Sequence, residues 1–362
     1  MGEYLLELQD LKTYFKVKAG MVRAVDGVSF AIKPGEKLGV VGESGCGKSV
    51  TALSIMRLLP HPPAEYAGGS VLFEDQDLLD LPESAMRKIR GGKIGMIFQD
   101  PMTCLNPTMT VGNQIGEALR IHLKLSKDEA RKRAVSLLEQ VGIPAAAERV
   151  NSYPHQFSGG MRQRVMIAIA LACNPKLLIA DEPTTALDVT VQAQILELID
   201  AVATDFGTAV MLITHDLGVV AGMADRVVVM YAGKVVETAP TNELFVNPSH
   251  PYTLGLLASV PRLDEKRHSQ LKTIEGAPPD MLKPPPGCPF MPRCAFARPI
   301  CRTMPPLDPV AGNAAHFKAC WVDVNDPNEQ AYAERRRQAR IEKMQAATNG
   351  QSATTLAASE EK

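Results

Sequence analysis

The chain has 362 residues, a length that favours two domains and allows a full hydrophobic core. Its 39 basic and 40 acidic side chains nearly cancel. This balance argues against a nucleic-acid-binding protein, which needs a basic face to neutralise phosphates, and against direct docking on an anionic bilayer. Hydrophobic residues at 45% and charged residues at 22% are typical of a globular protein and do not favour disorder.

No segment of the sequence predicts a membrane span, which would need about 18 or more apolar residues in a row. The most apolar region, residues 165–180, is interrupted by Asn174, Pro175 and Lys176. The N-terminus (MGEYLLELQDLK) has acidic residues where a signal peptide would have a basic region followed by an apolar one. We therefore expect a cytoplasmic protein that reaches a membrane only through a partner.

The predicted elements fall into three successive regions. Residues 1 to about 95 have the alternation and turns of short strands, and residues from about 105 to 160 are helical in character. From there to about residue 245, helical stretches separate brief apolar strands at residues 177–180, 210–213 and 227–230. Strands separated by helices form parallel sheets covered on their faces, so this order predicts an α/β fold.

Composition changes again beyond residue 245. Proline runs at residues 278–279 and 284–286 lead into a segment rich in cysteine. A charged stretch at residues 334–343 precedes a small, polar, low-complexity tail. We expect a separate unit at residues 248–322, followed at residues 323–362 by a charged helix and a disordered tail.

Residues 42–49 (GESGCGKS) match the phosphate-binding pattern GxxxxGK[ST]. Glycines at these positions let backbone N–H groups turn toward a β-phosphate, Lys48 reaches the β- and γ-oxygens, and Ser49 offers a hydroxyl to Mg²⁺. An apolar strand at residues 38–41 and a helix at about 50–59 give the loop its expected context. The predicted nucleotide-binding residues here are Gly42, Glu43, Ser44, Gly45, Cys46, Gly47, Lys48 and Ser49.

Two acidic residues, Asp181 and Glu182, follow the apolar strand at residues 177–180. Asp181 at the strand end suits an outer-shell contact to Mg²⁺, and Glu182 suits a general base that polarises the attacking water. Adjacent acids after a strand can also form a solvated turn. The phosphate loop in the same chain favours the magnesium and general-base interpretation.

A second anion-binding terminus is predicted at Ser158, Gly159 and Gly160, which open a helix. The phosphate loop already has a helix terminus of its own. Two phosphate-binding ends in one chain indicate that two chains face each other and that each completes the other's site.

With these motifs in this order, residues 1 to about 245 resemble the nucleotide-binding domain of ABC ATPases. The resemblance makes Gln99 the Q-loop residue that contacts Mg²⁺ and water, Asp188 a D-loop residue and His215 the switch histidine. Phe15 falls where the family stacks an aromatic ring on adenine, although Tyr14 could serve instead.

The resemblance implies a P-loop NTPase of ABC ATPase type over residues 1–247, with a RecA-like core, an antiparallel β subdomain and a helical subdomain at about 105–160. It implies ATP and Mg²⁺ as cofactors, two ATP molecules held between head-to-tail domains, and hydrolysis beside Glu182 that reopens the pair. Phe157 and Met161 replace the usual Leu and Gln of the signature. Because the Ser-Gly-Gly core is intact, we expect the site to work.

The C-terminal region carries HPYT at residues 250–253, VPRL at 260–263 and GCPFMPRC at 287–294. This stretch resembles the extension of ATPase subunits of oligopeptide and dipeptide permeases, most closely the D-type subunit. The resemblance implies a subunit that powers peptide import; nickel and sugar importers with similar extensions, and soluble ABC ATPases, are the alternatives. It also implies a second ATPase subunit in a heterodimer, two transmembrane permease subunits, an extracytoplasmic peptide-binding protein, and a peripheral position on the cytoplasmic face of the inner membrane.

Four of the seven cysteines cluster in this extension: Cys288, Cys294, Cys301 and Cys320. Their gaps of five, six and eighteen residues lack the short spacing usual in structural zinc sites. Four thiolates on proline-rich irregular chain suit a [4Fe–4S] cluster, and similar permease subunits carry such clusters. Zinc, and free or disulfide-bonded cysteines, are the alternatives. Because ATP-driven transport needs no electron step, we expect a structural role that holds the extension in place.

Overall fold

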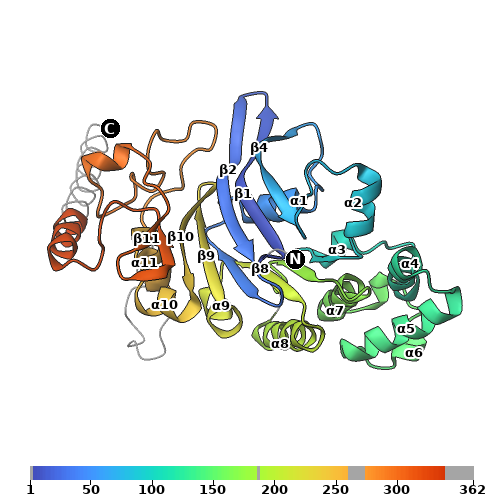
Figure 1. The fold of residues 1–362 in the computed structure, drawn as a ribbon. Coiled ribbons are helices and arrows are strands. Elements are labelled where there is room, and N and C mark those ends of the chain that lie inside the picture. The colour runs from blue at the N-terminus through green and yellow to red at the C-terminus, as the bar shows by residue number, and fades with distance from the viewer. Residues whose placement is uncertain (1–2, 186–187, 260–273, 339–362) are drawn as a thin grey trace, which may run out of the picture.

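Two β-sheets frame the chain, and helices pack against the larger one (Figure 1). The computed structural model describes residues 3–185, 188–259 and 274–338. The VPRL motif at residues 260–263 and the tail expected to be disordered, residues 339–362, lie outside the described residues. In the part of the chain that is described, no helix is long and apolar enough to cross a membrane.

The smaller sheet is antiparallel, with the strand order β2-β1-β4-β5. Its strands are β1 (Leu6–Val17), β2 (Gly20–Ile32), β4 (Ala64–Phe73) and β5 (Gln76–Asp77). In β1, buried Leu6 and Leu8 alternate with more exposed residues until the register shifts after Gln9. Asp10 adopts a positive φ of 50° at this bulge, and Leu11 returns to the core.

The larger sheet has eight strands in the order β11-β12-β10-β9-β3-β8-β7-β6. They are β3 (Lys37–Val41), β6 (Ile94–Ile97), β7 (Leu177–Asp181), β8 (Ala209–Thr214), β9 (Arg226–Tyr231), β10 (Lys234–Pro240), β11 (Asp308–Val310) and β12 (Asn313–Lys318). The strands from β9 to β6 are parallel, which confirms the α/β prediction. Successive residues of β7 enter different hydrophobic clusters on the two faces of the sheet, as expected for a parallel strand buried on both sides.

Eleven α-helices and two short 3₁₀-helices have bounds within the described residues. They are α1 (Lys48–Ile55), α2 (Glu83–Ile89), α3 (Pro101–Cys104), α4 (Val111–Leu123), α5 (Lys127–Gln140), α6 (Ala146–Arg149), η1 (Pro154–Gln156), α7 (Gly159–Leu171), α8 (Val189–Phe206), α9 (Leu217–Met223), α10 (Thr241–Val246), α11 (Pro251–Ala258) and η2 (Pro299–Arg302). A further helix occupies residues 327–338. Helix α5 begins at a capping box in which Ser126 and Glu129 each satisfy the other's backbone N–H. Helices α4 to α6 form a layer at one end of the molecule (Figure 1).

The C-terminal extension joins the opposite end of the larger sheet (Figure 1). Strand β12 pairs with β10, and β11 pairs with β12, so residues after 300 continue the same sheet. The buried carboxylate of Glu237 in β10 accepts hydrogen bonds from the backbone N–H groups of Ser249 (2.5 Å) and His250 (3.0 Å). It also contacts Nε2 of buried His316 at 2.7 Å. Buried polar groups and shared strands therefore fasten the extension to the sheet.

Candidate active site

The predicted site residues gather at the carboxyl ends of the parallel strands. The phosphate loop follows β3, Gln99 follows β6, Asp181 ends β7, and His215 follows β8. Carboxyl ends of parallel strands meet along one edge of a sheet, which is where ligands bind in open α/β sheets. The topology thus brings residues that are up to 173 positions apart in the chain onto one edge.

Glycine is required in the phosphate loop by close backbone approaches. A Cβ on Gly42 would lie 2.2 Å from the carbonyl oxygen of Met230, and a Cβ on Gly47 would lie 2.4 Å from that of Ala24. Gly47, with φ of 105°, is the N-cap of α1 and gives the helix no side-chain cap. The first N–H groups of α1 therefore have no side-chain acceptor at the cap and can bind a phosphate.

Lys48 is held inside the loop by backbone oxygens. Its side chain is buried, and Nζ donates to the carbonyl oxygens of Gly42 (2.7 Å) and Glu43 (3.1 Å). Cys46 is also buried, and burial raises the pKa of its thiol. The position of the Lys48 ammonium group therefore depends on where the first two residues of the loop lie.

The predicted magnesium residues meet directly. Ser49 Oγ donates to Asp181 Oδ1 at 2.9 Å, although the two residues lie 132 positions apart. Burial, and then the neighbouring Glu182 carboxylate, raise the pKa of Asp181, while the Ser49 hydrogen bond opposes the rise. A buried carboxylate in this position favours a nearby cation, because a cation removes the cost of holding the charge away from water.

Three predicted catalytic side chains also come together. Gln99 Nε2 donates to Glu182 Oε2 at 3.2 Å, and His215 Nδ1 lies 3.4 Å from Glu182 Oε1. Glu182 has a positive φ of 46°, and its backbone N–H donates to the carbonyl of Ile213 at the end of β8. The turn after β7 thus directs a largely buried carboxylate toward residues that follow two neighbouring strands.

Thr185 belongs to this group, and sequence reasoning gave it no role of its own. Its hydroxyl donates to Glu182 Oε2 at 2.9 Å. Three residues after the acidic pair, within a turn, a hydroxyl can reach back to the carboxylate. The three-residue spacing between Glu182 and Thr185 is the sequence feature that could have indicated this contact.

Ser158 and Gly159 of the predicted signature turn are exposed. Ser158 caps α7 by accepting from the N–H of Met161 (3.4 Å), and Gly159 has open space where a Cβ would lie. Phe157 is buried in the helical core, so the exchange of Leu for Phe keeps an apolar core residue. Gln163 Nε2 donates to the carbonyl of Pro183 at 2.6 Å and connects α7 to the turn that carries Glu182.

Two other predicted nucleotide residues have structural partners whose relation to ATP stays a prediction. Asp188 caps α8 by accepting from the N–H of Val191 at 2.9 Å, and residues 186–187 before it lie outside the described residues. Phe15 is half-buried in β1. The hydroxyl of neighbouring Tyr14 donates to Asp26 at 2.6 Å, and burial with this contact raises the pKa of Tyr14 to about 12.

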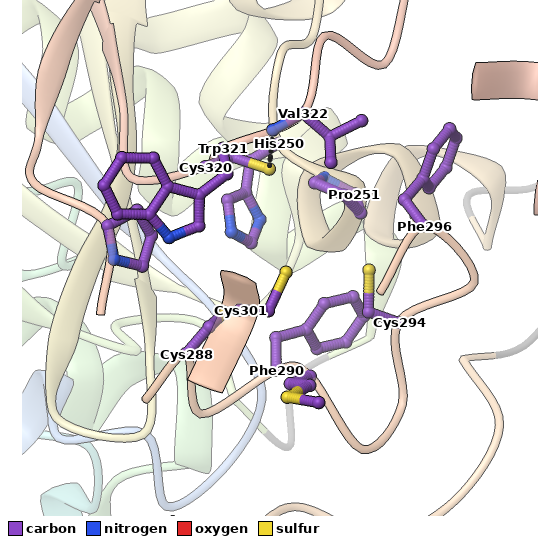
Figure 2. A pocket seen from close by; sticks show the side chains of 12 residues that line it. His250, Pro251, Cys288, Phe290, Cys294, Phe296, Cys301, Cys320, Trp321 and Val322 are labelled. Carbon is purple, nitrogen blue, oxygen red and sulfur yellow. Dashed lines mark hydrogen bonds between the residues drawn. The ribbon is translucent and has the colours of Figure 1, made fainter. Parts of the chain in front are cut away.

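Figure 2 shows the cavity in the extension that the four clustered cysteines line, together with Phe290, Phe296 and Trp321. Burial raises the pKa of Cys288 and Cys294, and it raises that of Cys320 to about 11. None of the seven cysteines forms a disulfide bond in the structure. Within the described residues, no three His, Cys, Asp or Glu side chains are grouped to hold a single metal ion.

The edge of the sheet therefore carries the residues predicted to form a phosphate loop, a magnesium pair and a general base, and the predicted signature turn begins α7. The model of the ABC transporter family matches residues 25–185, and that of the oligopeptide/dipeptide transporter C-terminal region matches residues 236–301. The dimeric post-hydrolysis structure of the ATP-binding cassette MJ0796 bound to ADP and Pi is similar with a TM-score of 0.59 and 31% identity, covering 65% of this chain and 98% of that one.

Relatives that match most of the chain identify the group within this family to which it is most similar. The oligopeptide transport ATP-binding protein OppD of Bacillus subtilis is 56% identical over 319 residues, 88% of each chain. The dipeptide transport ATP-binding protein DppD of the same organism is 55% identical over 320 residues, 88% of this chain and 95% of that one. The chain belongs to the ABC transporter ATPase family, in the group that carries the oligopeptide/dipeptide transporter C-terminal region.

Proposed function

We propose that this chain is the ATP-hydrolysing subunit that powers an ABC importer of oligopeptides or dipeptides. The observation that carries the proposal is the combination of a complete nucleotide edge with a C-terminal region of oligopeptide/dipeptide transporter type on the same sheet. The relatives named for oligopeptide and dipeptide transport extend over 88% of the chain, so the likeness includes the extension. In this proposal residues 1–247 form the ATPase domain and residues 248–322 the extension.

Hydrolysis follows from the roles we assign to the gathered side chains. Lys48 and the N-terminal N–H groups of α1 would bind the phosphates, while Ser49 and Asp181 would hold Mg²⁺, with Asp181 as an outer-shell contact. Glu182 polarises the attacking water, and its contacts with Gln99, Thr185 and His215 orient the carboxylate. The phosphate-binding donors of the loop would lower the barrier, because donors that are in place before the reaction need no rearrangement to stabilise developing charge.

The exposed signature turn supports a head-to-tail pair of cassettes. Ser158, Gly159 and Gly160 lie at the N-terminus of α7, where an anion is favoured. In the pair, this turn binds the ATP that is held by the phosphate loop of a second cassette. We propose a second, similar ATPase as that partner in a heterodimer, two transmembrane permease subunits, an extracytoplasmic peptide-binding protein, and a place on the cytoplasmic face of the inner membrane.

We also propose that the four cysteines around this cavity hold a [4Fe–4S] cluster. Three of its four thiol donors lie on irregular chain and Cys301 lies in η2, and burial keeps buried thiols protonated unless a cationic centre compensates them. A single tetrahedral zinc needs all sulfurs at about 2.3 Å from one point, whereas a cube spreads its ligands more widely. Cys288, Cys294, Cys301 and Cys320 would hold the cluster, which would cross-link the extension. Iron and a brown colour in anaerobically purified protein support this assignment; zinc, or no metal, overturns it.

Co-purification tests the proposed function. Expressed with its genomic neighbours, the affinity-tagged chain is expected to bring down two multispanning permease subunits, and the permease complex is expected to take up labelled oligopeptide in an ATP-dependent manner. Recovery with DNA, ribosomes or a nickel or sugar permease would contradict it. A Lys48→Ala variant is the control, because it is expected to assemble without binding ATP.

A further inference from the structure

Two side chains of the C-terminal extension reach Glu43, the second residue of the phosphate loop. They are Tyr252, from α11, and Arg293, from the cysteine-rich segment. Neither belongs to the nucleotide motifs, and they lie 209 and 250 positions from Glu43. The ATP site therefore has contacts that no cassette motif supplies.

Tyr252 holds the backbone of the loop. Its hydroxyl accepts a hydrogen bond from the Glu43 N–H at 2.7 Å, and its ring is fully buried. The ring packs against Tyr231 of β9 and Phe290 of the extension, with ring centres 4.6 Å and 5.4 Å away. An aromatic residue fixed on both sides in this way gives its hydroxyl a single position.

Arg293 holds the side chain of the same residue. Its guanidinium donates to both carboxylate oxygens of Glu43, at 2.5 Å and 2.9 Å, which is the bidentate geometry of strong arginine–carboxylate pairs. The same group donates to the carbonyls of Ile274 and Glu275 and to the Tyr231 hydroxyl. The arginine side chain is only 5% exposed, so its position is set by the extension around it.

The restrained residue is one that positions Lys48. The Lys48 ammonium group donates to the carbonyls of Gly42 and Glu43. A shift of these two residues would therefore displace the positive charge that binds the phosphates. Arg293 also neutralises the carboxylate of a residue that belongs to the phosphate loop. Without the arginine, that negative charge would repel the phosphates of ATP.

We propose that Arg293 and Tyr252 are positioning residues for ATP, and that the extension holds the first two residues of the phosphate loop, Gly42 and Glu43, in place through its contacts with Glu43. We call this arrangement the clamp. The extension then sets the affinity of the ATP site. This proposal concerns nucleotide binding and does not depend on which solute is transported.

Binding of a fluorescent ATP analogue to the full-length chain tests the arginine. Arg293→Met is expected to raise the Kd about tenfold, since a hydrogen-bonded charged contact is lost. Arg298→Met is the matched control, because Arg298 pairs with Glu329 at 2.5 Å within the extension. The control is expected to leave the Kd unchanged.

A double-mutant cycle separates a clamp from a purely structural arginine. Glu43→Gln removes the charge that Arg293 neutralises, so the Arg293→Met/Glu43→Gln pair is expected to bind ATP more tightly than Arg293→Met alone. If Arg293 only stabilises the extension, Glu43→Gln will give no such recovery. That result, or an unchanged Kd in folded Arg293→Met, overturns the proposal for Arg293.

The tyrosine provides a second test that does not depend on the folding of the arginine variant. Tyr252→Phe keeps the buried ring and removes only the acceptor, so the Kd is expected to rise about fivefold at an unchanged melting temperature. Tyr332→Phe is the matched control, since that hydroxyl contacts Ala297 in the extension. An unchanged Kd in Tyr252→Phe overturns the clamp.

Discussion

At the nucleotide edge, the predicted site residues lie at or just after the ends of parallel strands, whereas in the extension three of the four clustered cysteines lie on irregular chain and Cys301 lies in η2. The nucleotide edge gains its precision from regular hydrogen-bonded strands, which fix the backbone positions of Asp181 and His215. The extension gains its order from buried polar contacts to the sheet, chiefly those of Glu237. One sheet therefore supports two regions by different means, and the two regions meet at Glu43.

The largest expected effect is at the nucleotide edge. Glu182→Gln is expected to lower the rate of ATP hydrolysis by about 10²- to 10⁴-fold, because an amide cannot accept the proton of the attacking water. ATP binding is expected to persist, since the phosphate loop is unchanged. Hydrolysis and binding by the assembled complex check this, with Glu197→Gln on the surface of α8 as the control. Rapid turnover by Glu182→Gln would remove the general-base role.

The next effect is at the attachment of the extension. Glu237→Leu is expected to lower the free energy of unfolding by about 3–5 kcal/mol, because two backbone N–H groups and His316 lose a buried partner. Urea denaturation measures the change, with exposed Glu65→Gln as the control. A stability equal to that of the control would mean that packing alone fastens the extension.

The smallest effect is at Thr185. Thr185→Val keeps the shape and removes the hydroxyl that donates to Glu182, so hydrolysis is expected to slow by about two- to tenfold with ATP binding unchanged. Steady-state hydrolysis measures this loss. If Thr185→Val hydrolyses ATP at the wild-type rate, the carboxylate is oriented without the threonine, and Gln99 and His215 suffice.

Much of the nucleotide edge could be predicted because its motifs are contiguous in the chain. The phosphate loop lies within eight residues, and Asp181 and Glu182 are adjacent, so local chemistry identifies them. Gln99 and His215 have no local signature as strong, and they came from family resemblance. Their meeting with Glu182 depends on the order β8-β7-β6, which short motifs do not encode.

The attachment of the extension could not be predicted for the same physical reason. Strand β12 pairs with β10, and His316 contacts Glu237, so residues about 80 positions apart are joined. Neither a histidine nor a glutamate indicates by itself which residue it will contact. The clamp on Glu43 joins residues 250 positions apart. Such contacts arise from the packing of the whole chain, so a sequence pattern reveals them only once the fold is known.

Uptake of a labelled oligopeptide into vesicles that contain the assembled complex tests the central claim most directly. The chain is expected to support uptake that requires ATP, with hydrolysis stimulated by the peptide-loaded binding protein. Both activities are expected to disappear with Glu182→Gln. ATP hydrolysis without uptake of any oligopeptide or dipeptide, together with uptake of a different solute, would contradict the account.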